Sequence, residues 1–419
     1  MVKNDYIAFD NGFYPNDWQE DSLGKLCDYV DYRGATPAKK ARGIFLITAK
    51  NIKKGYIDYS ISQEYVAAND YESTMHRGLP KLGDVLITTE APVGNVAQVD
   101  KEKVALAQRI IKYCAHECVV NNTFLKYMLL SYNFQKKLES ASTGGTVQGI
   151  KGSLLHNLKI AYPKIEEQTA IATALSDTDA LIDSLEKLIA KKQAIKQGAM
   201  QELLTGKRRL KGFSGEWKEI NLAAASKMKA RIGWQGLTTG EYLSEGYAYL
   251  ITGTDFNSHR IDWENCWFVD KSRYLQDRNI IVKNGDLLIT KDGTIGKVAY
   301  IEGLSKPATL NSGVFLIRPL NYSYNTKFVS YVLSSNVFDI FLEQLSAGST
   351  INHLYQKDFV KFVFRAPELK EQQAIAQILT DMDDEISALQ KKLDKVRRIK
   401  QGMMAELLTG RIRLSEPSP

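Results

Sequence analysis

The sequence contains a long internal repeat, and this feature limits the possible architectures more than any other. Residues 163–210 align with residues 367–414 without a gap, and 25 of the 48 positions are identical. Each copy begins with a proline and a Glu-Gln pair and ends shortly after the run Glu-Leu-Leu-Thr-Gly. Agreement over this length predicts that the chain is a tandem duplication.

The segments that precede the two copies are less alike but keep their landmarks in the same order. The run Gly-Asp-Val-Leu-Ile-Thr at 83–88 recurs as Gly-Asp-Leu-Leu-Ile-Thr at 285–290, and Gly-Phe at 12–13 recurs at 212–213. We therefore expect a first globular domain at 1–162, a first helical region at 163–210, a second globular domain at 211–366, a second helical region at 367–414 and a tail at 415–419.

Both conserved segments are predicted to form long helices. Neither 166–204 nor 370–408 contains a proline, and apolar residues recur with the 4-3 spacing that is typical of a helix packed along another helix. The apolar seam consists of Ile171, Leu175, Ile182, Leu185 and Ile189 in the first copy and Ile375, Leu379, Met382, Ile386, Leu389, Leu393 and Val396 in the second. A helix of this length spans roughly 58 Å.

Such a helix needs a partner that covers its apolar stripe, and the simplest partner is the other copy. The first helix leads from the first globular domain to the second, and pseudo-twofold symmetry directs the second helix back. We therefore expect an antiparallel pair with the two chain termini close together. The alternative is two ordinary surface helices, each packed on its own domain. Basic residues outside the seam, such as Lys192, Lys196 and Arg397, are expected to be solvated.

Each globular domain is predicted to mix strands and helices. Short runs rich in Val, Ile, Tyr and Thr indicate strands, and they lie at 44–48, 84–88, 247–252, 286–290 and 314–318. Helices are expected at 123–138 and 327–345. The predicted fold class is therefore α+β, with two mixed α/β domains separated by a long antiparallel two-helix coiled coil and related by an internal pseudo-twofold repeat.

Polar and basic residues concentrate in three loops that recur in both domains: 33–37 and 231–235 before the first strand, 88–89 and 290–294 after the Gly-Asp strand, and 143–146 and 348–353. Gly, Ser and Thr allow a phosphate to approach the backbone, whereas Arg, Lys, Asn and Gln can reach base edges. The candidate DNA contacts are Arg33, Thr36, Lys50, Lys53, Thr89, Thr146, Gln148 and Lys151 in the first domain and Arg231, Gln235, Thr254, Lys291, Thr294, Lys297, Thr350, Asn352 and Lys357 in the second. The alternative is that these loops are plain turns. The net charge of +7 permits a nucleic-acid partner without requiring one.

The sequence contains no recognisable catalytic or cofactor-binding motif. The run Gly-Thr-Ile-Gly-Lys at 293–297 has too short a glycine spacing for a phosphate loop, and the motifs of amino-methyltransferases are absent. Asp286 with Lys291 could suggest a nuclease, but Asp84 in the first domain has no matching lysine. We expect both aspartates to begin strands after a glycine turn instead.

Metal binding and membrane insertion are also not expected. Cys114, His116 and Cys118 have an unusual spacing for zinc, and no second cluster completes four ligands. No run of about 18 apolar residues occurs. With only four cysteines, a reducing cytoplasm is the expected location.

These features together resemble one protein family. Two helices that begin with Glu-Gln-x-x-Ile-Ala and end in Glu-Leu-Leu-Thr-Gly, each behind a divergent domain, resemble the specificity (S) subunits of type I restriction–modification systems. The run Gly-Phe-x-x-x-Trp-Lys-Glu at 212–219 is similar to the usual start of a second recognition domain. The resemblance covers essentially the whole chain.

The resemblance implies that each globular domain is a target-recognition domain for one half of an asymmetric, bipartite site in double-stranded DNA. It implies that the helices set the spacing and dock two methyltransferase subunits, which hold S-adenosylmethionine, and that ATP- and Mg-dependent restriction subunits join the full complex. This chain would then be a non-catalytic subunit without its own cofactor. Two alternatives stay open, namely a coiled-coil scaffold or adaptor, and an orphan specificity subunit without active partners.

Overall fold

The computed structural model describes residues 6–10, 12–32, 37–142, 148–232, 236–257, 259–346 and 353–414. The chain divides into two compact units. Unit 1 comprises residues 1–186 and 391–419, and unit 2 comprises residues 187–390. Each unit therefore combines one globular domain with a part of both long helices, which is a different division from the domain limits expected from the repeat.

Unit 1 contains the first eleven strands. They are β1 (Tyr6–Phe9), β2 (Gly12–Pro15), β3 (Gln19–Ser22), β4 (Cys27–Asp31), β5 (Ile44–Ile47), β6 (Tyr65–Val66), β7 (Val85–Thr89), β8 (Val93–Gln98), β9 (Ala105–Leu106), β10 (Ile110–Ala115) and β11 (Lys159–Tyr162). Its shorter helices are α1 (Leu23–Leu26), η1 (Ala68–Asp70), α2 (Tyr71–Thr74), α3 (Asn122–Leu130), α4 (Tyr132–Ala141) and α5 (Gly152–Asn157).

Unit 2 contains the other eleven. They are β12 (Lys218–Asn221), β13 (Ser226–Ala230), β14 (Ala248–Ile251), β15 (Phe256–Asn257), β16 (Arg260–Ile261), β17 (Trp267–Val269), β18 (Leu287–Thr290), β19 (Val298–Tyr300), β20 (Ala308–Leu310), β21 (Val314–Pro319) and β22 (Val363–Ala366). Its shorter helices are α7 (Leu222–Ala225), η3 (Thr239–Glu241), α8 (Lys271–Leu275), η4 (Arg278–Ile280), α9 (Thr326–Val332), α10 (Asn336–Leu345) and η5 (Gln356–Lys361).

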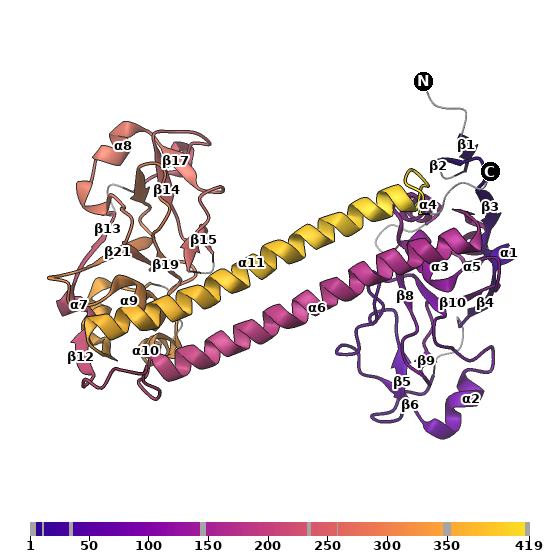
Figure 1. Cartoon of the computed structure of the whole chain (residues 1–419), viewed down its shortest axis with the longest axis horizontal. Helices are drawn as coiled ribbons and strands as arrows, with labels where there is room; N and C mark the ends of the chain where they lie inside the picture. Colours follow the sequence, from indigo (N-terminus) through magenta and orange to yellow (C-terminus); the bar gives the residue numbers. More distant parts are fainter. Residues whose placement is uncertain are drawn as a thin grey trace. The chain divides into compact units, whose positions relative to one another are not determined.

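The two units share one sheet topology. A four-stranded antiparallel sheet has the order β4-β10-β7-β8 in unit 1 and β13-β21-β18-β19 in unit 2. A three-stranded sheet has the order β6-β5-β9 and β17-β14-β20, with one parallel pair in each. In unit 1, α3 packs on β7, β8 and β10 of the larger sheet (Figure 1). The predicted α+β class, with a duplicated architecture, is confirmed.

The predicted strands are present, but each predicted domain helix is two helices. The segment 123–138 forms α3 and α4, which are separated at Ser131, and 327–345 forms α9 and α10. Ser131 has extended backbone angles and its hydroxyl accepts the N–H of Phe134, so it caps the second helix of the pair. This local hydrogen bond competes with helix continuation at a residue that the apolar pattern spans without a break.

The long helices are α6 (Ile165–Leu203) and α11 (Leu369–Leu407), each of 39 residues. In unit 1 the first part of α6 runs antiparallel to the last part of α11. Two ion pairs show this direction: Asp179 with Lys400 at 2.5 Å, and Glu186 with Arg397 at 2.6 Å. Unit 2 holds the complementary parts, and the equivalent pair there is Lys196 with Asp383, also at 2.5 Å. The antiparallel direction that we predicted from the repeat is confirmed in each unit.

The ends of the predicted seam enter the globular cores. Ile171 and Leu175 belong to the core of unit 1 together with Leu407 and Leu408 at the end of α11. The core of unit 2 contains the matching set, which is Ile375, Leu379, Leu203 and Leu204. The other seam residues are buried or half-buried. The 4-3 spacing therefore identifies the buried face of each long helix correctly. At the ends of the seam, however, the globular core and not only the other helix covers this face.

Glycines close both long helices with a left-handed backbone. Gly206 has φ +73° and Gly410 has φ +69°. A Cβ on Gly410 would lie 2.6 Å from Pro15 Cδ and 3.2 Å from Trp18, so the start of the chain packs directly on this turn. The hydroxyl of Tyr6 also donates to the Gly410 carbonyl at 3.3 Å. The two ends of the described chain are thus close together within unit 1, as we predicted.

Replacing Gly410 with alanine is expected to destabilise unit 1 by about 3 kcal/mol, because left-handed strain adds to overlap with Pro15. Gly402→Ala in the same helix is the control. Nothing lies within 4 Å of a Cβ at Gly402, so that change should stabilise the helix by about 0.5–1 kcal/mol. Chemical denaturation followed by hydrogen exchange in unit 1 measures both effects. Equal effects of the two variants would contradict this account of the turn.

Candidate nucleic-acid interface

Three loops of unit 1 that are distant in sequence lie together at one end of its sheets. The side-chain amide of Asn95 donates to the carbonyl of Ile52 at 2.7 Å, which joins the loop after β5 to the start of β8. The N–H of Ile150 donates to the carbonyl of Thr89 at 2.9 Å, which adds the segment before α5. The segments that carry Lys50, Lys53, Thr89, Gln148 and Lys151 are therefore neighbours in this unit, whereas residues 33–36 and 143–147 of the selected loops lie outside the described residues.

Unit 2 repeats this arrangement with equivalent hydrogen bonds. The N–H of Leu354 donates to the carbonyl of Lys291 at 2.9 Å, as Ile150 does to Thr89. The hydroxyl of Thr290 accepts the N–H of Lys297 at 2.9 Å, and the hydroxyl of Thr88 accepts the N–H of Asn95 at 3.0 Å. A Cβ on Gly253, after β14, would lie 3.5 Å from Thr290. The three loops of unit 2 are thus also adjacent.

The turn after β5 and β14 is stabilised by the same contact in both units. Asn51 accepts the N–H of Thr48 at 2.9 Å, and Asp255 accepts the N–H of Thr252 at 2.7 Å. Burial raises the pKa of Asp255 despite these hydrogen bonds. We call the backbone of these segments, with the hydrogen bonds that join them, the loop frame. Individual hydrogen bonds of the loop frame are the same in both units.

Side chains that extend from this common frame differ between the units. The positions of Lys50, Thr89, Arg109 and Gly149 in unit 1 correspond to those of Thr254, Lys291, Gly313 and His353 in unit 2, respectively. The surface chemistry at equivalent places is thus different, although the same backbone hydrogen bonds join the segments that present it.

Unit 1 also has a pocket of about 230 Å³ beside these loops. Its polar lining consists of Lys39, Thr48, Lys50, Ser62, Glu64, Gln108 and Arg109. Lys39 pairs with Glu64 at 2.8 Å, and Arg109 lies 3.6 Å from Glu90 outside the lining. The pocket therefore exposes mixed charge next to the first and second loops.

Most of the described candidate residues are accessible. Lys50, Gln148, Lys151, Thr254, Thr294 and Lys357 are exposed, and Lys53, Lys291 and Lys297 are half-buried. Lys357 lies on η5, and its ammonium group is 5.2 Å from the centre of the Tyr355 ring. The remaining candidates Arg33, Thr36, Thr146, Gln235, Thr350 and Asn352 lie outside the described residues, as does the tail at 415–419.

Two candidates are buried, and their predicted contact with DNA is corrected. Arg231 is 3% exposed, and its guanidinium donates to the carbonyl of Leu310 at 2.8 Å and to Thr309 at 3.2 Å. Thr89 is 1% exposed, and its backbone joins two other segments. Both residues stabilise the frame. The position of a residue near a loop in the sequence does not reveal whether its side chain points inward.

Sequence analysis missed four polar residues at the same place, namely Glu90, Arg109, Asp292 and His353. Arg109 has a left-handed backbone, with φ +73°, in the turn between β9 and β10. Asp292 and His353 form an isolated bridge, and so do Glu90 and Gly149. Extending the match of 83–88 with 285–290 by a few residues would have placed Glu90 and Asp292 at equivalent positions, and this signal was available in the sequence.

The repeated Glu-Gln pair attaches each long helix to a globular domain. The side chain of Gln168 accepts the N–H of Asn121 at 2.9 Å and donates to the carbonyls of Val119 and Pro163 at 2.9 and 2.8 Å. Asn121 in turn caps α3. In unit 2, Gln372 accepts the N–H of Asn325 at 2.8 Å in the same way.

The glutamate of this pair binds an arginine that follows the other long helix. Glu167 forms a bidentate pair with Arg413, with both N···O distances at 2.6 Å. Glu371 pairs with Arg209 at 2.8 and 2.6 Å. Each pair joins one copy of the repeat to the other, which explains why the two copies have kept the same residues.

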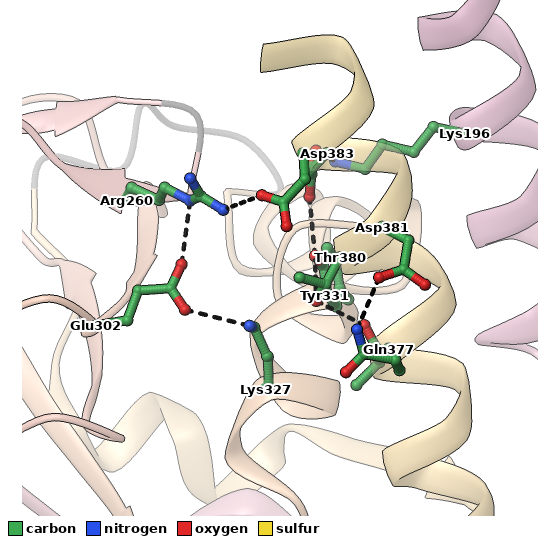
Figure 2. Close-up of polar contacts among 11 residues, drawn as sticks. Lys196, Arg260, Glu302, Lys327, Tyr331, Gln377, Thr380, Asp381 and Asp383 are labelled. Carbon is green, nitrogen blue, oxygen red and sulfur yellow. Dashed lines mark hydrogen bonds and ion pairs between the residues drawn. The ribbon is translucent and has the colours of Figure 1, made fainter. Parts of the chain in front are cut away.

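A polar network fixes the second domain on the helices within unit 2 (Figure 2). Asp383 of α11 accepts the hydroxyl of Tyr331 at 2.8 Å and the ammonium of Lys196 at 2.5 Å. Arg260 donates to Asp384 at 2.6 Å and lies 3.2 Å from Glu302. Burial raises the pKa of Tyr331. Lys196, which was expected to be solvated, is therefore a structural residue, and Lys192 and Arg397 also pair with the opposite helix.

The aspartates considered for a nuclease have structural partners. Asp84 accepts the N–H of Lys81 at 2.8 Å and pairs with Lys112 at 2.9 Å. Asp286 accepts the N–H of Lys283 at 2.6 Å and pairs with Arg318 at 2.6 Å. The interpretation that they begin strands after a glycine turn is confirmed. Among the residues placed in the structure, no helix is long and apolar enough to cross a membrane.

Comparison with known proteins gives one consistent result. The family model described as the type I restriction modification DNA specificity domain matches residues 15–197 and 240–398. The MjaVIII type I restriction enzyme specificity subunit of Methanocaldococcus jannaschii is 23% identical, over 96% of this chain and 94% of its own length. The EcoBI specificity subunit of Escherichia coli is 21% identical, over 74% and 70% respectively.

Solved structures agree at the level of the fold. The S subunit of the type I restriction–modification system from M. genitalium has a TM-score of 0.64 at 16% identity, with 97% of each chain covered. A chain from a study of assembly and conformational transition of the type I restriction–modification system has a TM-score of 0.54 at 17% identity, over 95% of this chain and 99% of that one. The repeat, the shared topology and the family match together establish that this chain belongs to the type I restriction–modification DNA specificity subunit family.

Proposed function

We propose that this chain selects an asymmetric, bipartite DNA site, with one half recognised by the globular domain of each unit. One observation carries the proposal. The two domains share a loop frame down to the Thr88 and Thr290 hydrogen bonds, yet they present different side chains from it. Two copies of one scaffold with different surface chemistry are suited to two different half-sites. Loops on a rigid scaffold are a common place for recognition residues.

The proposed contacts are the accessible candidates on the converging loops. Lys50, Lys53, Gln148 and Lys151 serve the first half-site, and Thr254, Lys291, Thr294, Lys297 and Lys357 serve the second. Lys50, Lys53, Lys151, Lys297 and Lys357 supply phosphate contacts that fix the register, whereas Gln148, Thr254, Lys291 and Thr294 approach base edges. Arg33, Thr36, Thr146, Gln235, Thr350 and Asn352 stay in the set on the sequence argument alone.

We further propose that the helices α6 and α11 set the distance between the half-sites and dock two methyltransferase subunits. A helix of 39 residues spans roughly 58 Å, and B-DNA rises about 3.4 Å per base pair, so the half-site centres are at most about 17 base pairs apart. Matched helices present the same surface twice, which suits two copies of one partner.

Catalysis then belongs to the partner subunits. The methyltransferase subunits would hold S-adenosylmethionine, and restriction subunits in the full complex would use ATP and Mg. The chain itself needs no cofactor for recognition. Its work would be in the cytoplasm, where the DNA lies.

Co-expression with the methyltransferase subunit, followed by mapping of modified adenines across a genome, tests this function. We expect methylation at a split, asymmetric motif that is lost when either globular domain is replaced. A contiguous palindromic motif would contradict recognition by two different domains. A stable complex that gives no methylation would favour the scaffold alternative or an orphan subunit.

A further inference from the structure

A carboxylate occupies the same position at the converging loops of both units. The backbone of Glu90 forms an isolated antiparallel β-bridge with Gly149, and the backbone of Asp292 forms the equivalent β-bridge with His353. A Cβ on Gly149 would lie 3.5 Å from Glu90 Cβ, and a Cβ on Gly313 would lie 3.6 Å from Asp292 Cβ. The carboxylate in unit 2 is therefore close to position 313, which corresponds to Arg109 in unit 1.

Each carboxylate has a cationic neighbour, but the cation comes from a different strand end. In unit 1 it is Arg109, before β10, with Nε 3.6 Å from Glu90 Oε2. In unit 2 glycine replaces that arginine, and the cation is Lys291, directly after β18, with Nζ 3.3 Å from Asp292 Oδ2. The unit 1 equivalent of Lys291 is the buried Thr89. The carboxylate therefore has the same position in both units, whereas the cationic side chain comes from a different position. The two centres combine the same charges in a different geometry.

His353 adds a third group to the centre of unit 2. Its Nδ1 contacts the carboxylate of Asp292, and its Nε2 lies 3.4 Å from Lys291 Nζ. The imidazole ring thus contacts both the lysine and the aspartate.

Stability alone does not account for the pair in unit 1, whereas in unit 2 the Lys291 side chain is only 12% exposed. Arg109 and Glu90 have side chains that are 48% and 38% exposed, and such exposed pairs contribute little to folding. Arg109 also adopts a left-handed backbone that a non-glycine residue reaches only at a cost. A strained residue that supports a weak, exposed ion pair points to a role outside folding.

We propose that each centre recognises one G·C base pair of its half-site. The cation donates to N7 and O6 of guanine, and the carboxylate accepts from the N4 amino group of cytosine, which together match the major-groove edge of that pair. The centres are Arg109 with Glu90 in unit 1, and Lys291 with Asp292, oriented by His353, in unit 2. This proposal rests on the proposed function, because it assumes that the converging loops face DNA.

The test uses the complex with the methyltransferase subunit and duplexes in which each base pair of the mapped site is changed in turn. In Lys291→Ala, we expect discrimination at one G·C pair of the second half-site to fall by about 10- to 100-fold, with the first half-site unaffected. Arg109→Ala should relax one G·C pair of the first half-site only. Asp292→Asn, which keeps the shape of the acid, should also relax the position that Lys291 recognises.

Arg273→Ala is the control, because Arg273 of α8 forms a partly buried ion pair with Glu241 of η3, outside the residues of this centre. It should leave the mapped motif unchanged, and thermal unfolding of each variant verifies folding. Uniform weakening at all sequences in Lys291→Ala and Arg109→Ala would overturn the proposal and mark phosphate contacts. An unchanged motif would overturn it as well. Either result, with a split asymmetric motif in the unaltered chain, would leave the proposed function intact.

Discussion

Replacing Arg413 with alanine is expected to destabilise unit 1 by about 3 kcal/mol, because Glu167 loses its bidentate partner while staying buried. The Glu167 side chain is 2% exposed, so water cannot replace the arginine. The effect should appear as faster amide hydrogen exchange in the core of unit 1, with unit 2 unchanged. Local exchange is the right measurement, since a chain of two units has no single unfolding free energy.

Two further variants test this expectation. Arg209→Ala removes the equivalent partner of Glu371 and should destabilise unit 2 instead. Arg411→Ala removes an exposed arginine next to Arg413 and should change stability by less than about 0.5 kcal/mol. If Arg413→Ala and Arg411→Ala had the same small effect, the cross-copy ion pair would not be the reason for the repeated glutamate.

Replacing Gln168 with leucine is expected to destabilise unit 1 by about 3 kcal/mol. The change leaves the N–H of Asn121 and the carbonyls of Val119 and Pro163 without their partner. The hydrogen bond to Pro163 is buried and the other two are partly buried, and an unsatisfied buried group costs about 1–3 kcal/mol. Because Asn121 caps α3, exchange at the start of that helix should rise most. Hydrogen exchange with mass spectrometry resolves this segment.

The matched control is Gln201→Leu, the same substitution at an exposed position of α6. It should leave the stability of both units within about 0.5 kcal/mol of the unaltered chain. Gln372→Leu should move the effect to the start of α9 in unit 2. A Gln168→Leu chain with unaltered exchange in α3 would show that the glutamine does not attach the helix to the domain.

The repeated elements were well predicted from the sequence, because each pattern in one half of the chain could be compared with its copy in the other half. The predicted strands at 84–88 and 286–290 differ at one position only, Val85 against Leu287, and the structure has them as β7 and β18. The direction of α6 and α11 followed from connectivity and symmetry alone. By contrast, periodicity could not reveal that Ser131 interrupts a helix, since a single hydroxyl hydrogen bond decides it.

The candidate site was predicted only in outline. The recurrence of three polar loops in both halves marked the region, but two of the loops in unit 1 fall largely outside the described residues. Whether a side chain points outward depends on local backbone angles, so Arg231 was selected although it is buried, and Arg109 was overlooked although it is exposed. Similarly, Lys196 seemed part of a solvated charge run, and only the packing of α11 identifies Asp383 as its partner.

The central claim is that each globular domain recognises its own half-site, and a duplicated first half tests it most directly. In that chain a second copy of residues 12–210 replaces residues 212–414, so that both domains are the same. Co-expressed with the methyltransferase subunit, it should direct adenine methylation to an inverted repeat of the first half-site, because twofold-related identical domains recognise a palindromic site. Methylation that still requires the second half-site would contradict the account.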